Sequence, residues 1–277
     1  MYRQPLSSLR NPAFRLYYGA LIGQMASMNM QMVARGFLAY DLTGSEAILG
    51  SITLAATVPM LLLSLFGGVI AERVQKKYVM LIGQAGSAMV ALGVAIALTL
   101  GYISPTIPES WWILVIASML QGTIMGLMMP ARQAILPEIV GEQQLLNAVS
   151  LNVMGMNLFR IMSPAIAGFL IEAFGYKAVY FTMTSLYLMA VVFIVFLPPT
   201  SKISIPESGA FRQIKEGLSY VRHETTILII LAFTLAGVIL SFPYMMLMPV
   251  FAVDVLKVGA GGMGILISVS GIGAIIA

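Results

Sequence analysis

The sequence predicts an all-α integral membrane protein built as a bundle of transmembrane helices. Of its 277 residues, 59% are hydrophobic and 9% are charged, whereas a soluble domain carries roughly 25% charged residues. Because this number of charged residues is too small to cover a water-facing surface, lipid must surround most of the chain. Its apolar runs reach the roughly 20 residues of a spanning helix and lack the alternation over about ten residues typical of barrel strands. Because lipid admits only helices or closed barrels, we expect helices.

Eight apolar segments follow one another, each long enough to cross a bilayer. Six come in close succession, and a longer polar connection divides them from the last two. We therefore expect a six-helix bundle over residues 1–197, a cytoplasmic linker over 198–224, and the first two helices of a second bundle over 225–277. The expected spans lie near residues 14–40, 46–70, 78–100, 111–135, 145–173, 177–197, 225–251 and 261–277.

The linker carries apolar residues at three- and four-residue spacing, with charged residues between them. That spacing places Phe211, Ile214, Leu218 and Val221 on one face of a helix. We expect an amphipathic helix on the cytoplasmic surface of the membrane.

The basic residues of the connections fall almost entirely on one side of the predicted bundle. Lys and Arg gather on the cytoplasmic side of membrane proteins, so the N-terminus is expected inside and the odd-numbered helices run outward. Trp111 and Trp112 then lie at the outer interface, where aromatic anchors are frequent. We expect a multi-pass protein of the cytoplasmic (inner) membrane. The cytoplasmic side holds Arg3, Arg10, Arg15, Arg73, Lys76, Lys77, Arg132, Lys202, Arg212, Lys215 and Arg222, against Lys177 and Lys257 outside.

The last apolar segment runs to residue 277 without a polar tail. A terminal carboxylate is costly inside hydrocarbon. We therefore expect the sequence to be truncated within its eighth helix.

The residue inventory argues against several chemistries. The sequence has no cysteine, and its single histidine, His223, lies in a polar stretch, so we expect neither disulfides nor a metal site. The stretch from Gly259 to Gly264 has the glycine spacing of a dinucleotide-binding loop, but it opens an apolar run instead of following a strand. The net charge of +4 is spread over the connections. We expect no cofactor, no nucleic-acid partner and no enzymatic activity.

The connection between the second and third segments carries a candidate gating motif. A small residue precedes an acid and a basic cluster in the candidate residues Gly68, Glu72, Arg73, Lys76 and Lys77. Glycine lets helices approach closely, and the charges can form ion pairs that lock one conformation. A plain positive-inside loop explains the same residues without either role.

This connection resembles the loop signature of the major facilitator superfamily, which reads Gly, an apolar pair, Ala, Asp, Arg, any residue, Gly, Arg, Lys. The sequence matches at Gly68, Ala71, Arg73 and Lys77, and departs at Glu72, Gln75 and Lys76. The topology and the linker agree, so the resemblance covers the whole chain as helices 1 to 8 of an expected twelve. It implies about four further helices and a substrate site at the midplane between two six-helix halves.

The fourth segment resembles the drug and siderophore exporter branch of that superfamily, which includes enterobactin-type exporters. The run from Pro130 to Glu138 reads Pro-Ala-Arg-Gln-Ala-Ile-Leu-Pro-Glu. The superfamily often has an arginine four residues before the glycine that is Gly122 here. Ser118 occupies that position, so the proton-linked role of the arginine does not carry over. The prolines also suit a helix end.

The fifth segment contains Ser163-Pro164-Ala-Ile-Ala167-Gly168, which resembles the Gly-Pro-x-x-Gly-Gly element of antiporters. Pro164 and Gly168 match, while Ser163 and Ala167 are small replacements. Small residues permit close packing and proline bends a helix. Ordinary packing remains an alternative, but the resemblance favours export over import.

Two arginines fall within predicted spans: Arg35 in the first and Arg160 near the middle of the fifth. A charge in a span usually faces a water-filled cavity or a partner. The resemblance places helices 1 and 5 beside the central cavity. For Arg35, the alternative is that it extends outward and pairs with Asp41.

Several neutral polar residues accompany these arginines. Gln24, Gln31 and Arg35 share one helix face, because offsets of 7 and 11 residues return nearly to the same angle, and Asn157 neighbours Arg160. The expected substrate-cavity residues are Arg35, Arg160, Asn157, Gln24, Gln31 and Gln121.

These observations favour a secondary active transporter that exports a small organic molecule, siderophore or drug-like, by alternating access. No acid falls at mid-membrane, since Asp41, Glu172 and Asp254 lie near the external ends. Unpaired arginine suits an anionic or oxygen-rich substrate. We expect a proton gradient as the energy source and a monomer as the assembly state. The alternatives are an uptake transporter of the same fold and a non-transporting, truncated membrane protein.

Overall fold

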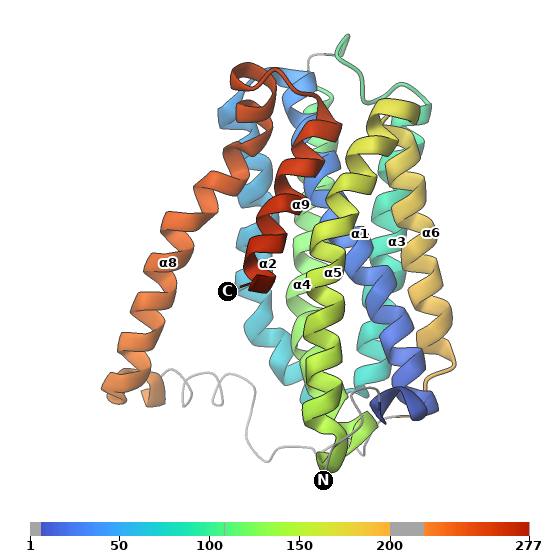
Figure 1. Cartoon of the computed structure of the whole chain (residues 1–277), viewed down its shortest axis with the longest axis vertical. Coiled ribbons are helices and arrows are strands. Elements are labelled where there is room, and N and C mark those ends of the chain that lie inside the picture. Colours follow the sequence, from blue (N-terminus) through green and yellow to red (C-terminus); the bar gives the residue numbers. More distant parts are fainter. Residues whose placement is uncertain (1–6, 108, 200–218, 277) are drawn as a thin grey trace.

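The computed structural model describes residues 7–107, 109–199 and 219–276, and these residues form helices joined by short turns, with no strand among them (Figure 1). The prediction of an all-α membrane bundle is confirmed. The helix expected in the linker falls mainly on residues 200–218, which lie outside the described residues.

Each of the eight apolar segments is helical, and most helices extend a few residues beyond the predicted span into polar sequence. Five of them, α2 to α6, meet the length and hydropathy expected of a membrane-crossing helix. The helices are α1 (Pro12–Thr43), α2 (Glu46–Arg73), α3 (Lys76–Thr99), α4 (Trp111–Val140), α5 (Glu142–Phe174), α6 (Tyr176–Val195), α8 (Thr225–Val250) and α9 (Ala260–Ile276), with the short turns η1 (Ser7–Arg10) and η2 (Phe251–Val255).

Local capping determines where the first two helices begin and end. The Asn11 side chain accepts hydrogen bonds from the backbone N–H groups of Ala13 and Phe14 at the start of α1. Gly44 ends this helix with a positive φ of 57°, a conformation that glycine adopts without strain. The hydroxyl of Ser45 then caps α2. A tight turn therefore reverses the chain between two long spans.

Glycines bring α2 and α4 into close contact. The glycines Gly122 and Gly126 of α4 lie against the backbone carbonyls of Ala56 and Met60, and Gly67 of α2 lies against Gly126. Such small residues let helix backbones approach in lipid, where packing rather than hydrophobicity drives association.

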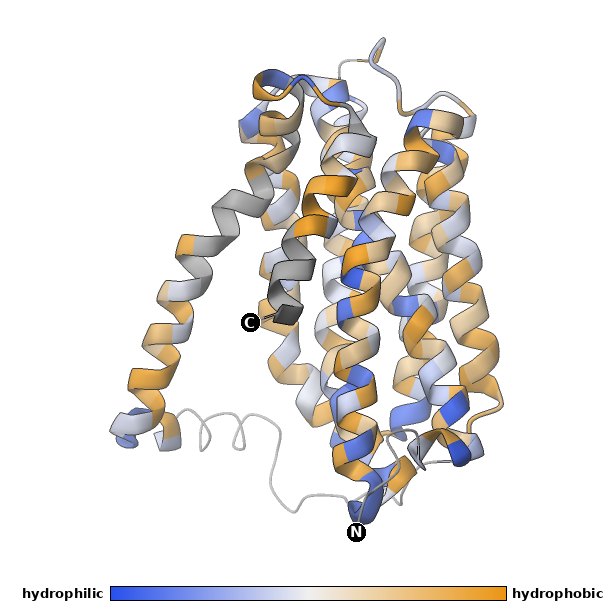
Figure 2. Cartoon of the chain, in the orientation of Figure 1, coloured by the Kyte–Doolittle hydropathy of each residue, from blue (hydrophilic) through white to orange (hydrophobic). Residues whose placement is uncertain are grey.

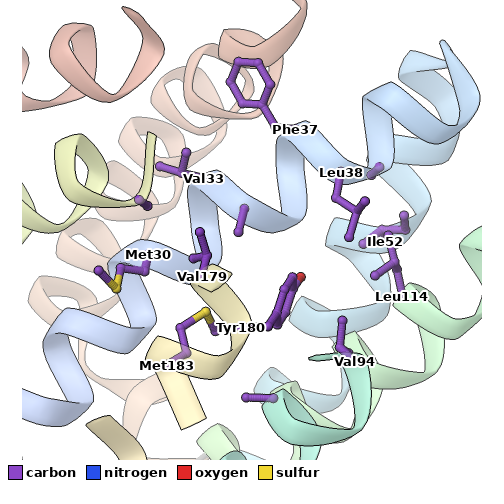
Figure 3. Close-up of a cluster of buried hydrophobic side chains, with 14 of the residues drawn as sticks. Met30, Val33, Phe37, Leu38, Ile52, Val94, Leu114, Val179, Tyr180 and Met183 are labelled. Carbon is purple, nitrogen blue, oxygen red and sulfur yellow. The ribbon is translucent and has the colours of Figure 1, made fainter. Parts of the chain in front are cut away.

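Two apolar cores fill the bundle, one above the other along the helix axes. The outer core includes Val33, Phe37, Val94, Leu114 and Tyr180 (Figure 3). The inner core, nearer the N-terminus, includes Phe14, Tyr17, Met128, Ile135 and Ile194. Residues from α1, α3, α4, α5 and α6 contribute to both cores, so these five helices form one packed unit.

Large apolar side chains also cover the outside of the bundle. Leu61, Leu62, Ile82 and Phe169 are all more than half exposed, and Figure 2 shows apolar residues along the helices with hydrophilic residues gathered toward the ends. A soluble protein rarely exposes so much contiguous apolar surface, so this surface is the lipid-facing one.

The two helices after the linker meet the six-helix bundle differently. α9 packs along α5, whereas α8 contacts α1 and α2 only sparsely. In Figure 1, α8 lies close to the bundle at the end away from the N-terminus and diverges from it toward the other end.

Candidate functional site

Arg160 lies close to the middle of α5 and is exposed. It makes no hydrogen bond or ion pair with any described residue. The neighbouring residue Ile161 contacts α9, since its carbonyl accepts a hydrogen bond from the Ser268 hydroxyl. Asn157, one turn earlier, is half-buried. A full positive charge is thus presented beside the contact between α5 and α9, without an acidic partner in the described chain.

Arg35 is half-buried on α1 and points toward α4. Its Nη1 donates a long hydrogen bond of 3.5 Å to the Ser118 hydroxyl. Asp41 instead accepts a hydrogen bond from the Tyr176 hydroxyl. The alternative pairing of Arg35 with Asp41 is therefore not formed.

The two arginines lie at different depths. The Tyr18 hydroxyl of α1 donates to the Leu151 carbonyl of α5, and its ring lies against Gly155. Because α1 and α5 run in the same direction, Arg160 is level with residues near 25 of α1. Arg35 is about ten residues further along α1, which at 1.5 Å per residue is roughly 15 Å nearer the end of that helix at Thr43. The structure does not gather both cations at one point.

The structure corrects the placement of two expected cavity residues. Gln24 is fully buried, and its amide nitrogen faces the sulfur atoms of Met125 and Met128 at 3.9 and 4.0 Å. Gln121 is 5% exposed, and its amide donates to the Ser87 hydroxyl at 3.1 Å. Both side chains lie inside the bundle because α4 and α3 cover them. Gln31, one turn before Arg35 on α1, is half-buried.

The lysines of the candidate gating loop contact two other helices at the end of the bundle nearer the N-terminus. Lys76 forms a 2.7 Å ion pair with Glu138 near the end of α4. Lys77 donates to the backbone carbonyls of Val195 and Leu197 at the end of α6, where a cation complements the negative end of the helix dipole. These two contacts connect the start of α3 to the ends of two other helices.

The other residues of this loop have different surroundings. Glu72 and Arg73 are exposed at the end of α2, and Glu72 has no hydrogen-bond or ion-pair partner among the described residues. A Cβ at Gly68 would meet nothing within 4 Å, so the close helix approach expected there is wrong for the described chain. The approach occurs at Gly67, because that neighbouring glycine faces α4.

The small-residue element of α5 packs against α9. Ser163, Pro164 and Gly168 are all buried. A Cβ at Gly264 of α9 would lie 2.5 Å from the Pro164 carbonyl oxygen, which leaves room only for glycine. This element therefore forms the surface on which the second half begins.

Sequence reasoning missed the polar contacts that join α9 and η2 to the bundle. A Glu172 carboxylate oxygen accepts a 2.8 Å hydrogen bond from the Gly261 backbone N–H, in the first turn of α9. The Tyr40 hydroxyl donates to Asp254 in η2 at 2.5 Å. The glycine run that resembles a nucleotide-binding loop therefore serves helix packing and capping. Its position at the start of an apolar run was the available signal.

The N-terminal turn also makes contacts that were not predicted. The Ser8 backbone N–H donates to the Asn147 side chain at 3.0 Å, and the Asn11 amide donates to the Ile139 carbonyl at 3.0 Å. Ser8 of η1 and the N-cap residue Asn11 thus fasten the start of α1 to the first turns of α5 and to the end of α4. Among the described residues, no three His, Asp or Glu side chains gather as a possible metal site.

Comparisons with known proteins agree with this architecture. A family described as transmembrane secretion effectors, of the major facilitator type, matches residues 3–277. The chain is 28% identical over 267 residues to the staphyloferrin A transporter of Staphylococcus aureus, an alignment that covers 96% of this chain and 64% of that protein. It is 26% identical over 190 residues to an uncharacterized MFS-type transporter of Bacillus subtilis, covering 67% of this chain and 43% of that protein. The chain thus spans less than two thirds of the length of these relatives.

Proposed function

The chain belongs to the transmembrane secretion effector family of the major facilitator superfamily, and from this premise we propose that it exports a small, anionic or oxygen-rich organic molecule across the cytoplasmic membrane by alternating access. Members of such a family transport solutes and are not enzymes. The proposed orientation places the N-terminus and the Lys76–Glu138 pair on the cytoplasmic side.

One relative supports a substrate rich in oxygen acceptors. It is named a staphyloferrin A transporter and thus carries a siderophore. Siderophores present carboxylate or catecholate-type oxygens, which the planar fork of an arginine recognises well. The similarity to the drug and siderophore exporter branch noted in the sequence leads to the same substrate class.

Arg160 is the observation that carries the proposal. Arginine does not lose its charge by deprotonation, and an unpaired cation at mid-membrane is costly. No described residue neutralises Arg160, so an anionic group of the substrate is the proposed partner. Arg35 adds positive potential from α1, about 15 Å nearer the external end.

The conformational cycle requires the two halves to move relative to one another. We assign the loop from Gly68 to Lys77 to gating, because its lysines join the start of α3 to the ends of α4 and α6. A proton gradient is the proposed energy source for a monomeric carrier. The coupling carboxylate is not assigned to any residue here.

The substrate assignment can be tested by transport of two probes of opposite charge. The intact protein in proteoliposomes is given an anionic and a cationic organic probe of similar size. We expect Arg160→Gln to lower transport of the anionic probe by about tenfold to a hundredfold, which corresponds to one lost charge-assisted contact. Arg160→Lys, the matched control, should retain part of this transport. Equal losses for both probes in Arg160→Gln would make Arg160 a structural residue.

Transport direction needs a separate measurement. In inverted vesicles energised with a proton gradient, an exporter accumulates the anionic probe. Accumulation in right-side-out vesicles alone would identify uptake by the same fold instead.

A further inference from the structure

A layer of buried polar side chains separates the two apolar cores of the bundle. We define it as Gln24 of α1, Gln84 and Ser87 of α3, Gln121 of α4 and Tyr187 of α6. Gln24, Gln84, Ser87 and Tyr187 are fully buried, and Gln121 is 5% exposed. These residues come from four of the five helices that build both cores.

Contacts between the helices place these residues at one depth. Gly83, which precedes Gln84, lies against Met128, while Ser87 bonds Gln121. Gln24 faces the same Met128 sulfur from α1. Gly23 lies against the Leu186 carbonyl, so Gln24 is also level with Tyr187 on α6.

Four buried hydrogen-bonding atoms in this layer have no partner among the described residues. Gln84 has no partner for either its amide oxygen or its amide nitrogen, and the oxygen of Gln24 is likewise unpaired. The Tyr187 hydroxyl lies beside Gln121 without completing a well-formed hydrogen bond. Buried polar groups in proteins are nearly always paired, with protein atoms or with ordered water, and each unpaired group costs free energy.

The chemistry of the unpaired groups selects the ligand. An anion would need only donors, but the layer offers the oxygens of Gln24 and Gln84. A cation would need only acceptors, but the Gln84 amide nitrogen is a donor, and Arg35 bonds Ser118 about one turn from Gln121. Water both donates and accepts, and typically bridges two to four polar groups when buried.

We propose that the layer of Gln24, Gln84, Ser87, Gln121 and Tyr187 is a buried hydration site, in which ordered water bridges the two glutamine amides and the tyrosine hydroxyl. The site lies within the six-helix bundle and not at Arg160. It therefore does not depend on the proposed substrate or on the direction of transport.

Oxidative labelling by X-ray radiolysis tests this proposal, because bound water releases hydroxyl radicals next to buried side chains. The intact protein in lipid nanodiscs is irradiated, and the oxidation of single methionines is followed by mass spectrometry. Met125 and Met128 contact Gln24 and are 7% and 1% exposed, while Met30 of the outer core is 3% exposed and serves as the matched control. We expect the two layer methionines to oxidise about tenfold faster than Met30. Equal rates in the wild-type protein would overturn the proposal.

Two variants locate the water within the layer. Gln84→Leu removes both unpaired amide groups and should bring the oxidation of Met128 close to that of Met30. Thr184→Val removes a buried hydroxyl that already bonds the Tyr180 carbonyl and should leave the oxidation rates unchanged. Fast oxidation that persists in Gln84→Leu would contradict the assignment of the water to Gln84. The wild-type comparison decides the question even if a variant does not fold.

Discussion

Two adjacent glycines at the end of α2 should respond in opposite ways to the same substitution. In Gly67→Ala the new Cβ would lie 2.5 Å from the Gly126 carbonyl oxygen and 2.9 Å from the Leu127 carbonyl oxygen, so α2 and α4 must separate. A comfortable contact of about 3.5 Å requires a shift of roughly 1 Å. In Gly68→Ala the new methyl group meets nothing within 4 Å.

The magnitude follows from two effects. Alanine favours the helix over glycine by about 1 kcal/mol at either position, whereas forced overpacking costs about 1–3 kcal/mol at Gly67 alone. Helix propensity is common to both variants, so the difference between their unfolding free energies isolates the clash. We expect Gly67→Ala to be less stable than Gly68→Ala by about 1–3 kcal/mol.

Reversible unfolding in lipid bicelles provides the measurement. Both variants are compared with the wild-type chain under the same conditions. The reasoning fails if the unfolding free energies of Gly67→Ala and Gly68→Ala differ by less than about 0.5 kcal/mol. In that case the close packing of α2 on α4 does not restrict position 67 to glycine.

Three further contacts at the ends of the bundle lead to predictions of similar size. A double-mutant cycle of Lys76→Met and Glu138→Gln should return a coupling of about 1 kcal/mol in the unfolding free energy, and strictly additive losses would show that the 2.7 Å pair adds no stability. Lys77→Met should speed hydrogen exchange in the last turn of α6, since the helix end loses its cation; unchanged exchange would argue against this cap. Glu172→Gln keeps a hydrogen-bond acceptor for α9 but loses the charge, and unfolding should become easier by about 0.5 kcal/mol, whereas no change would mean that the dipole is screened there.

Composition and run length predicted the fold well because both are local properties of the chain. The apolar run near residues 145–173, for example, became α5 over Glu142–Phe174. Such a run requires a helix in lipid wherever its neighbours lie, since the backbone must pair within the segment. The three prolines within α4 and α5 did not interrupt those helices.

The partners of a helix face were not predictable in the same way. Gln24, Gln31 and Arg35 share a face by angle, but α4 buries that face completely at Gln24, whereas Gln31 and Arg35 are only half-buried. Gly67 and Gly68 differ by one residue, or about 100° around the helix, and only the position of α4 distinguishes them. The helix that packs against a given residue depends on how the whole bundle is assembled.

The contacts of the N-terminal turn also bear on how the protein is made. Ser8 bonds Asn147, which is 139 residues later in the chain. At a synthesis rate of about 5–20 residues per second, that partner emerges from the ribosome roughly 7–28 s after Ser8. During this interval α1 can enter the membrane, but Ser8 lacks its partner on α5. The contact between Ser8 and Asn147 therefore forms only after α5 has begun to emerge, and the end of α6, which Lys77 contacts, emerges later still.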